Sequence, residues 1–118
     1  MTNSTYRALI VRTDNTTEAV DISHDNEHVT INEIVGGWFA GVTNYELGAI
    51  CYVHDEGLLL GLDVNSIVSG MFGQYLVGDA VLVGIYNADG EMDGESYDLP
   101  ATLFESSARL DKLLKVIG

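Results

Sequence analysis

Short runs of apolar and β-branched residues alternate with polar or glycine-containing turns along most of the chain. Runs of this kind predict strands, and they occur at residues 6–12, 18–22, 38–43, 49–54 and 80–86. The last run, AVLVGIY, is the most apolar, so we expect it at the centre of the sheet, where both faces of a strand are covered. Asp14 and Asn15 form a turn signal that pairs the first two strands as a hairpin. Residues 58–62 are predicted to continue in an extended conformation.

A second pattern, with apolar residues three and four positions apart, predicts helices. Thr30 and Glu33 have the spacing of a capping box and predict a short helix that ends at Gly36 and Gly37. Asp63 is predicted to cap a second helix. The apolar face of that helix is expected to consist of Val64, Ile67, Val68, Met71 and Phe72.

The C-terminal segment predicts a third, amphipathic helix. Pro100 precedes it, and Thr102 and Glu105 have the spacing of another capping box. Basic residues lie toward its negative end, at Arg109, Lys112 and Lys115. Its apolar stripe comprises Leu103, Leu110, Leu113, Leu114 and Ile117. This stripe either packs on the sheet or forms a contact between two copies of the chain.

These elements predict one α+β domain over residues 1–118, with a twisted, mostly antiparallel sheet, two short helices and a C-terminal amphipathic helix. No repeat, linker or low-complexity tract marks a domain boundary. Residues 23–28 and 87–98 are predicted to be polar loops. A chain of 118 residues is long enough to bury a hydrophobic core without disulfides.

The charge is strongly acidic, with 18 Asp and Glu against 5 Lys and Arg and a formal net charge of −13. Binding to nucleic acid requires Lys and Arg that neutralise phosphates, so the balance argues against nucleic acid as a direct partner. Anionic membranes should repel the chain too. With no apolar run near the roughly 20 residues that span a bilayer, and no signal-peptide pattern, we expect a cytoplasmic location. The single cysteine, Cys51, excludes an internal disulfide.

Two interpretations of the charge remain open at this point. An acidic, lysine-poor surface stays soluble when salt screens its self-repulsion, which is typical of proteins adapted to high salt. An ordered array of carboxylates also imitates a phosphate backbone and can occupy a nucleic-acid-binding protein. The second interpretation predicts a protein partner with a basic surface.

Several sequence blocks resemble a family known only as a domain of unknown function, number 3846, found in phages, plasmids and their hosts. The blocks are ALIVRTD, IVGGWF, YVHDEGLLLGLDVN and YLVGDAVLVG, and together they span roughly residues 6–86. The resemblance implies a mixed α+β domain in a mobile-element context, and it implies no chemistry. The chain departs from the pattern at Asp63, where a proline is expected. Matched positions are Gly36, Gly37, Asp55, Glu56, Gly57, Gly61, Asn65, Gly78 and Asp79.

Two segments have partial metal-ligand spacing. Asp89, Glu91 and Asp93, followed by Gly94, resemble the first half of a calcium loop, but Pro100 stands where the loop needs a bidentate glutamate. A solvated hairpin loop is the favoured interpretation. His24 and His28 are four residues apart, but they lie in a predicted loop with no third ligand in view. We therefore expect no metal and no cofactor.

Nothing in the sequence selects a catalytic group. Cys51 and His54 lie three apart on a predicted strand and so face opposite sides of the sheet. No phosphate-binding glycine loop or nucleophile elbow is present. We therefore expect a non-enzymatic protein.

The middle of the chain concentrates aromatic residues, which supply much of the contact energy at interfaces. Core packing is the alternative role for them. The residues we single out for binding are Trp38, Tyr45, Asp55, Glu56, Asn65 and Asp79. Asn65 either caps a helix locally or contacts a ligand.

Three functions follow as hypotheses. The first is an inhibitor of a basic protein, encoded by a mobile element or its host, such as a counter-defence protein that imitates nucleic acid. The second is a protein that sequesters a nucleotide-like ligand, for which Arg7, Arg12, Arg109 and Asn65 are the available donors. The third is an accessory domain of a halophile whose acidity serves solvation alone.

Overall fold

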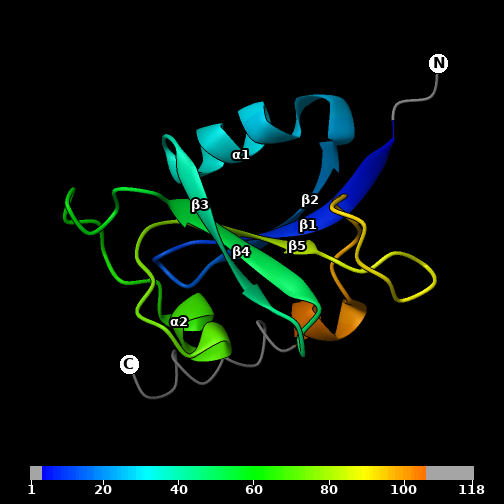
Figure 1. Cartoon of the computed structure of the whole chain (residues 1–118). Helices are drawn as coiled ribbons and strands as arrows, with labels where there is room; N and C mark the ends of the chain where they lie inside the picture. Colours follow the sequence, from blue (N-terminus) through cyan, green and yellow to red (C-terminus); the bar gives the residue numbers. More distant parts are fainter. Residues whose placement is uncertain (1–3, 106–118) are drawn as a thin grey trace.

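Five strands form one antiparallel sheet in the order β2-β1-β5-β4-β3 (Figure 1). The computed structural model describes residues 4–105. The strands are β1 Thr5–Val11, β2 Thr17–Ser23, β3 Phe39–Asn44, β4 Ala49–His54 and β5 Ala80–Gly84. All the residues of the central strand β5 are buried, so its predicted position is confirmed. The predicted α+β class with an antiparallel sheet is confirmed as well.

The helices begin at other residues than the sequence pattern predicted. A short 3-10 helix, His24–Asn26, leads directly into α1, Glu27–Val35, so the expected loop at residues 23–28 is largely helical. Thr30 lies inside α1 and does not cap it, because the chain is already helical before this position. Helix α2, Ser66–Phe72, is capped by Asn65 instead of Asp63.

Helix α1 covers one face of the sheet and α2 the other, together with a helical turn at residues 101–105 (Figure 1). Alternate side chains of β5 pack against the helices on opposite faces of the sheet, because successive side chains of a strand point to opposite faces. Val81 and Val83 pack in the cluster that contains Ile31 of α1. Leu82 packs in the opposite cluster, which contains Val68 of α2. The rest of the predicted C-terminal helix, including Arg109, lies outside the described residues.

The segment after β4 is a loop, and the prediction that residues 58–62 are extended was wrong. The backbone nitrogens of Leu60 and Leu62 donate to the carbonyls of Glu56 and Gly57, at 3.0 and 3.1 Å, and these bonds coil the chain. Gly61 adopts a φ of +69°, which favours glycine. Three successive leucines cannot all face one core in such a turn, so Leu58–Leu60 project into solvent.

The polar loop at residues 87–98 returns to the end of β5. The backbone of Tyr97 exchanges two hydrogen bonds with that of Gly84, at 2.9 and 3.0 Å. The chain then reaches β1, where the Leu99 nitrogen donates to the Arg7 carbonyl at 2.9 Å. This loop therefore forms one wall of the face that α1 only partly covers. Within residues 4–105, no helix has the length and apolar character that crossing a membrane requires.

Candidate functional site

Exposed apolar side chains gather around the loop that follows β4. Leu58, Leu59 and Tyr75 are 68%, 86% and 70% exposed and line a hollow of about 400 Å³ together with two carboxylates. Trp38, 78% exposed, adjoins this loop, because its carbonyl accepts a hydrogen bond from the Asp55 nitrogen at 2.9 Å. We name the following set the leucine-loop patch: Trp38, Asp55, Glu56, Leu58, Leu59 and Tyr75.

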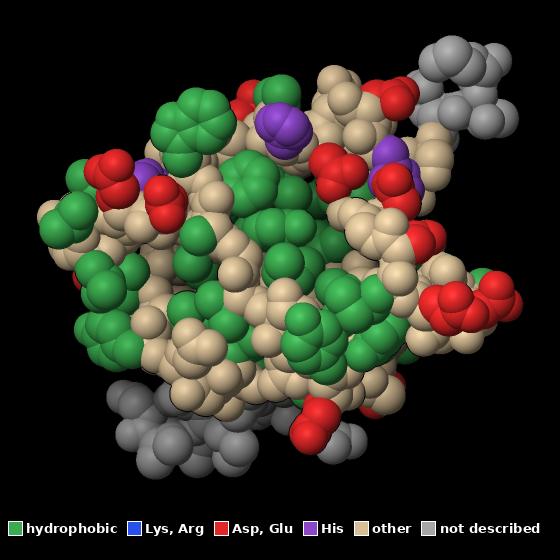
Figure 2. Space-filling view, in the orientation of Figure 1, with side chains coloured by type: hydrophobic (Ala, Val, Ile, Leu, Met, Phe, Trp, Pro, Cys, Tyr) green, Lys and Arg blue, Asp and Glu red, His purple; other side chains and the backbone are tan. Residues whose placement is uncertain are grey.

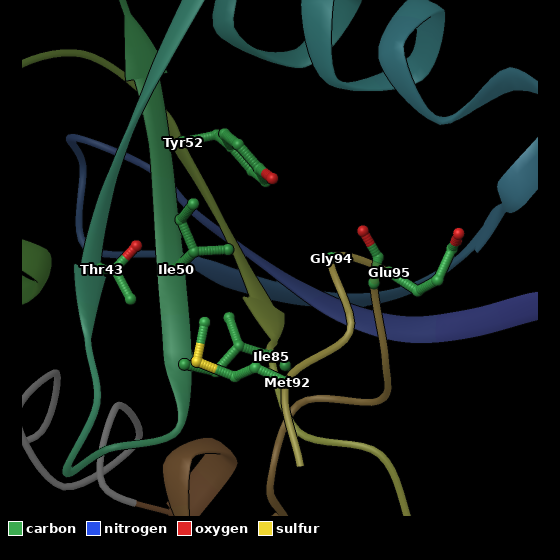
Figure 3. Close-up of a pocket in the computed structure, with 9 residues that line it drawn as sticks. Thr43, Ile50, Tyr52, Ile85, Met92, Gly94 and Glu95 are labelled. Atoms are coloured by element: carbon green, nitrogen blue, oxygen red, sulfur yellow. The ribbon is translucent and has the colours of Figure 1, made fainter.

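A second hollow, of about 160 Å³, lies on the opposite face of the sheet beside α1 (Figure 3). Ile50 and Tyr52 of β4 form its floor, and Met92 and Glu95 of the 87–98 loop form the facing wall. Thr43 of β3 lines its outer side. In the space-filling view, apolar side chains occupy the hollowed centre, and acidic and histidine side chains lie along its upper and right margins (Figure 2).

A carboxylate of α1 organises the inner end of this second hollow. The hydroxyls of Tyr6 and Ser96 donate to Glu27 Oε1, at 3.3 and 2.7 Å. Burial, with Glu27 nearby, raises the pKa of Tyr6 and of Tyr52 above the ordinary value of 10.0. Both phenols are therefore neutral at physiological pH and serve as hydrogen-bond donors or packing groups.

His24 ties the start of the sheet to the 87–98 loop. Its Nδ1 lies 3.1 Å from the Ser4 carbonyl oxygen, and its Nε2 lies 2.8 Å from the Ser96 carbonyl oxygen. Carbonyl oxygens only accept, so both nitrogens donate at once only when the imidazole is protonated. The bond to Ser96 is the main cause that raises the pKa of His24 above 6.5, and the bond to Ser4, Glu27 and Glu95 add to it.

The two hydrogen bonds of His24, which we call the His24 clasp, are predicted to stabilise the fold less as pH rises. Because the folded state holds the His24 proton more tightly than the unfolded chain does, the stabilisation is complete below pH 6.5 and is lost as pH passes the raised pKa. Urea unfolding across this range, with His24→Ala as the control, should show a pH-dependent difference between the two proteins. An NMR titration that gives His24 a pKa at or below 6.5 would contradict the clasp.

The structure separates the residues that the sequence singled out for binding. Trp38, Asp55 and Glu56 come together in the leucine-loop patch. Tyr45 lies at the other end of β3, exposed, with its carbonyl accepting from the Tyr86 hydroxyl at 2.9 Å. Asp79 is half-buried and accepts from the Thr13 nitrogen at 3.0 Å, beside neither group.

Asn65 is fully buried and serves the fold. Its Oδ1 accepts from the Val68 nitrogen at 3.3 Å and so caps α2. Its Nδ2 donates to the carbonyls of Val11 and Gly78, at 2.8 and 3.0 Å. Local capping, one of the two roles considered for this residue, is confirmed, and its amide has no donor left for a ligand.

A sequence comparison decides the family. The profile of a domain of unknown function, DUF3846, matches residues 6–105, which adds the 87–98 loop to the blocks that carry the resemblance. The chain belongs to the DUF3846 family. No curated protein matches it at a significant level.

A fold similar to that of this DUF3846 domain occurs in a solved structure of another protein. A crystal structure of the small RNA methyltransferase HEN1 is similar over 92% of this chain, with a TM-score of 0.57 and 18% sequence identity. The similar region makes up 16% of that HEN1 chain. At this identity the likeness shows a shared fold and carries no further information about activity.

The DUF3846 domain does not gather its partial metal motifs into a site within residues 4–105, where no three His, Cys, Asp or Glu side chains have metal-binding geometry. In the 87–98 loop, Asn87 Oδ1 accepts from the nitrogens of Asp89 and Glu91, and Asp93 Oδ1 accepts from the Glu95 nitrogen. These polar groups shape a turn. Cys51 faces a core cluster, and burial raises the pKa of its thiol to about 12.

Two arginines that the nucleotide hypothesis names as donors take part in ion pairs. Arg7 Nε lies 3.6 Å from Asp21 Oδ1, and Arg12 bonds Glu18 at 2.6 Å, both on the β1–β2 hairpin. This hairpin is at the sheet edge opposite the leucine-loop patch.

Sequence reasoning missed Leu58, Leu59 and Tyr75 in the DUF3846 domain. Their signal is the segment GLLLG, in which three leucines stand between glycines directly after an acidic turn. Such a segment suits neither an alternating strand nor one face of a helix. Its mismatch with both periods indicates an exposed apolar loop.

Proposed function

We propose that this domain is a non-enzymatic binding protein of a mobile element or its host, and that it acts by occupying a protein with a basic surface. The observation that carries the proposal is the leucine-loop patch, in which exposed Trp38, Leu58, Leu59 and Tyr75 lie beside Asp55 and Glu56. Leu58, Leu59 and Tyr75 share one hollow with the two carboxylates, and exposed apolar surface bordered by polar groups is typical of interaction sites. Large aromatic anchors also dominate binding energies at interfaces.

The charge distribution supports a basic partner. All of the Asp and Glu residues except Asp111 lie within residues 4–105. The two arginines in that range, Arg7 and Arg12, are both ion-paired on the β1–β2 hairpin, away from the patch. No Lys or Arg side chain is visible among the described residues on the face in Figure 2. Among residues 4–105, a basic surface would thus meet no Lys or Arg on this face.

A counter-defence role agrees with these features. Acidic groups attract a nucleic-acid-binding protein at long range and set the salt dependence of association. Apolar anchors supply the short-range contacts that keep the partner bound. The mobile-element context implied by the family resemblance makes a nuclease or other nucleic-acid-binding defence protein a fitting target.

Removing the apolar anchors should weaken binding without unfolding the domain. We expect Trp38→Ser and Leu59→Ser each to reduce affinity about tenfold, the usual effect of losing a central interface residue. The probe is a peptide selected by the wild-type domain from a displayed random library. The selected sequences should combine Lys or Arg with apolar residues, and fluorescence anisotropy should show affinity falling as salt rises.

Val29→Ser on α1 is the matched control, because Val29 is another exposed apolar residue, and it should leave affinity unchanged. Double-stranded DNA should not bind to any of these proteins. Selection of acidic or uncharged peptides, salt-independent binding, or direct DNA binding would overturn the proposal.

A further inference from the structure

We propose that the free edge of β3 receives an extended segment of the basic partner as an additional strand of the sheet. The inference rests on the proposed function and specifies how the partner is held. Strand addition to a sheet edge is an established mode of peptide recognition, in which main-chain hydrogen bonds give affinity and side-chain hollows give specificity.

The two edges of the sheet differ in protection. At the β2 edge, Glu18 and Asp21 form ion pairs with Arg12 and Arg7, and charged side chains of this kind discourage edge pairing. The β3 edge reads FAGVTN and holds no charged residue and no proline. Among the described residues, β3 pairs with β4 alone. Its outer side is thus open to another strand.

The hydrogen-bond alternation of β3 fixes which groups point outward. The Trp38 carbonyl accepts from the Asp55 nitrogen, so the bonded pairs of this ladder fall at Trp38 and at every second residue after it. The intervening residues are Phe39, Gly41 and Thr43. Their N–H and C=O groups point away from β4, and they are available to an incoming strand.

Small side chains leave this edge accessible. Ala40 and Gly41 are both exposed. A Cβ on Gly41 would meet Ile50 Cδ1 at 2.6 Å and Tyr52 at 3.2 Å, so glycine lets these two side chains, which form the floor of the second hollow, pack across β3. Neither residue obstructs the spacing of about 4.8 Å at which strands pair.

A hollow lies on each face of the sheet beside β3. Thr43 lines the hollow on the α1 face (Figure 3), and Ala40 lines the leucine-loop hollow on the other face. Successive side chains of a strand point to opposite faces. Alternate side chains of an added strand would therefore lie over one hollow or the other, which selects apolar residues in the partner segment.

Charge selects a basic partner over a second copy of the chain. Each end of β3 carries an exposed aromatic residue next to carboxylates: Trp38 with Asp55 and Glu56, and Tyr45 with Glu46. Two copies, each with a net charge of −13, would bring like charges together at this edge. A segment with Lys or Arg near both ends of an apolar centre complements it.

The test uses the library-selected peptide and two variants at one outward-facing position. Thr43→Pro removes the outward N–H without removing a ladder bond to β4, and we expect at least a tenfold loss of affinity. Thr43→Val keeps the N–H and the side-chain shape and should bind as wild type does. Circular dichroism and thermal melting establish that Thr43→Pro is folded.

A second measurement leaves the protein unchanged. Peptides N-methylated at one alternate set of amides should lose binding, and those methylated at the other set should keep it, because only alternate amides of an added strand face β3. If Thr43→Pro does not fold, this measurement alone decides the proposal. Equal tolerance of both methylation patterns would overturn strand addition.

The outcomes separate the two proposals. If Trp38→Ser and Leu59→Ser weaken binding but Thr43→Pro and both methylation patterns do not, strand addition is wrong and the proposed function stands. If none of these changes weakens binding, both are wrong. A wild-type dimer in sedimentation velocity that Thr43→Pro dissociates would overturn the proposal in favour of a second copy at this edge.

Discussion

Replacing Gly84 by alanine is expected to lower the free energy of unfolding by about 3 kcal/mol, the upper end of the usual cost of overpacking. A Cβ at this position would collide with the Asp98 carbonyl oxygen and lie 2.7 Å from its carbon. These are backbone atoms, which have no rotamer to relieve the clash. Both hydrogen bonds between Gly84 and Tyr97 would be strained or lost. Urea unfolding followed by circular dichroism measures the effect.

Gly70→Ala is the matched control for this substitution. Gly70 lies inside α2, and its Cβ would meet nothing within 4 Å. Alanine should therefore stabilise the domain by about 0.5–1 kcal/mol through its better helix propensity. Wild-type stability of Gly84→Ala would show that the segment at Tyr97 and Asp98 does not pack against β5.

Replacing Asn65 by alanine should also cost about 3 kcal/mol. It removes the cap of α2 and leaves the carbonyls of Val11 and Gly78 without their donor in the interior. Asn65→Asp should be more destabilising still, because it keeps the capping acceptor but places a carboxylate against two carbonyl oxygens. Chemical unfolding of both variants gives the order.

Asp63→Ala is the control, since the sequence pattern predicts this exposed residue as the cap of the same helix. We expect its free energy of unfolding to stay within about 0.5 kcal/mol of wild type, as for most surface substitutions. Equal losses for Asp63→Ala and Asn65→Ala would contradict the assignment of Asn65 as the cap.

The strands were predictable because each has a local signature. The run of β4 alternates buried and half-buried residues, and the run of β5 is continuously apolar and rich in β-branched residues. The start of α1 was less predictable than the strands, because Thr30 and Glu33 have capping-box spacing although Thr30 lies inside the helix. Capping is a question of backbone conformation at one residue, and side-chain spacing alone does not determine it.

The candidate site was only half predictable. Trp38, Asp55 and Glu56 were identified from residue type, and pairing of β3 with β4 brings Trp38 beside Asp55. Asn65 had the same polar character but is buried, because contacts with Val11 and Gly78 surround it. Tyr75 is distant in sequence from the leucines that it joins, so no local pattern places it there.

The sequence by itself determined the strands, the central place of β5 and the acidic character. It also indicated that the candidate site contains an aromatic residue, Trp38, and two carboxylates, Asp55 and Glu56. Within residues 4–105, the tertiary structure decided that β3 is an edge strand paired with β4 alone, that three leucines are exposed, and that two hollows lie beside that edge. The physical reason is that strands pair through backbone hydrogen bonds, which are common to all residues. Which strand lies at the edge of the sheet therefore depends on the whole sheet and not on any local pattern.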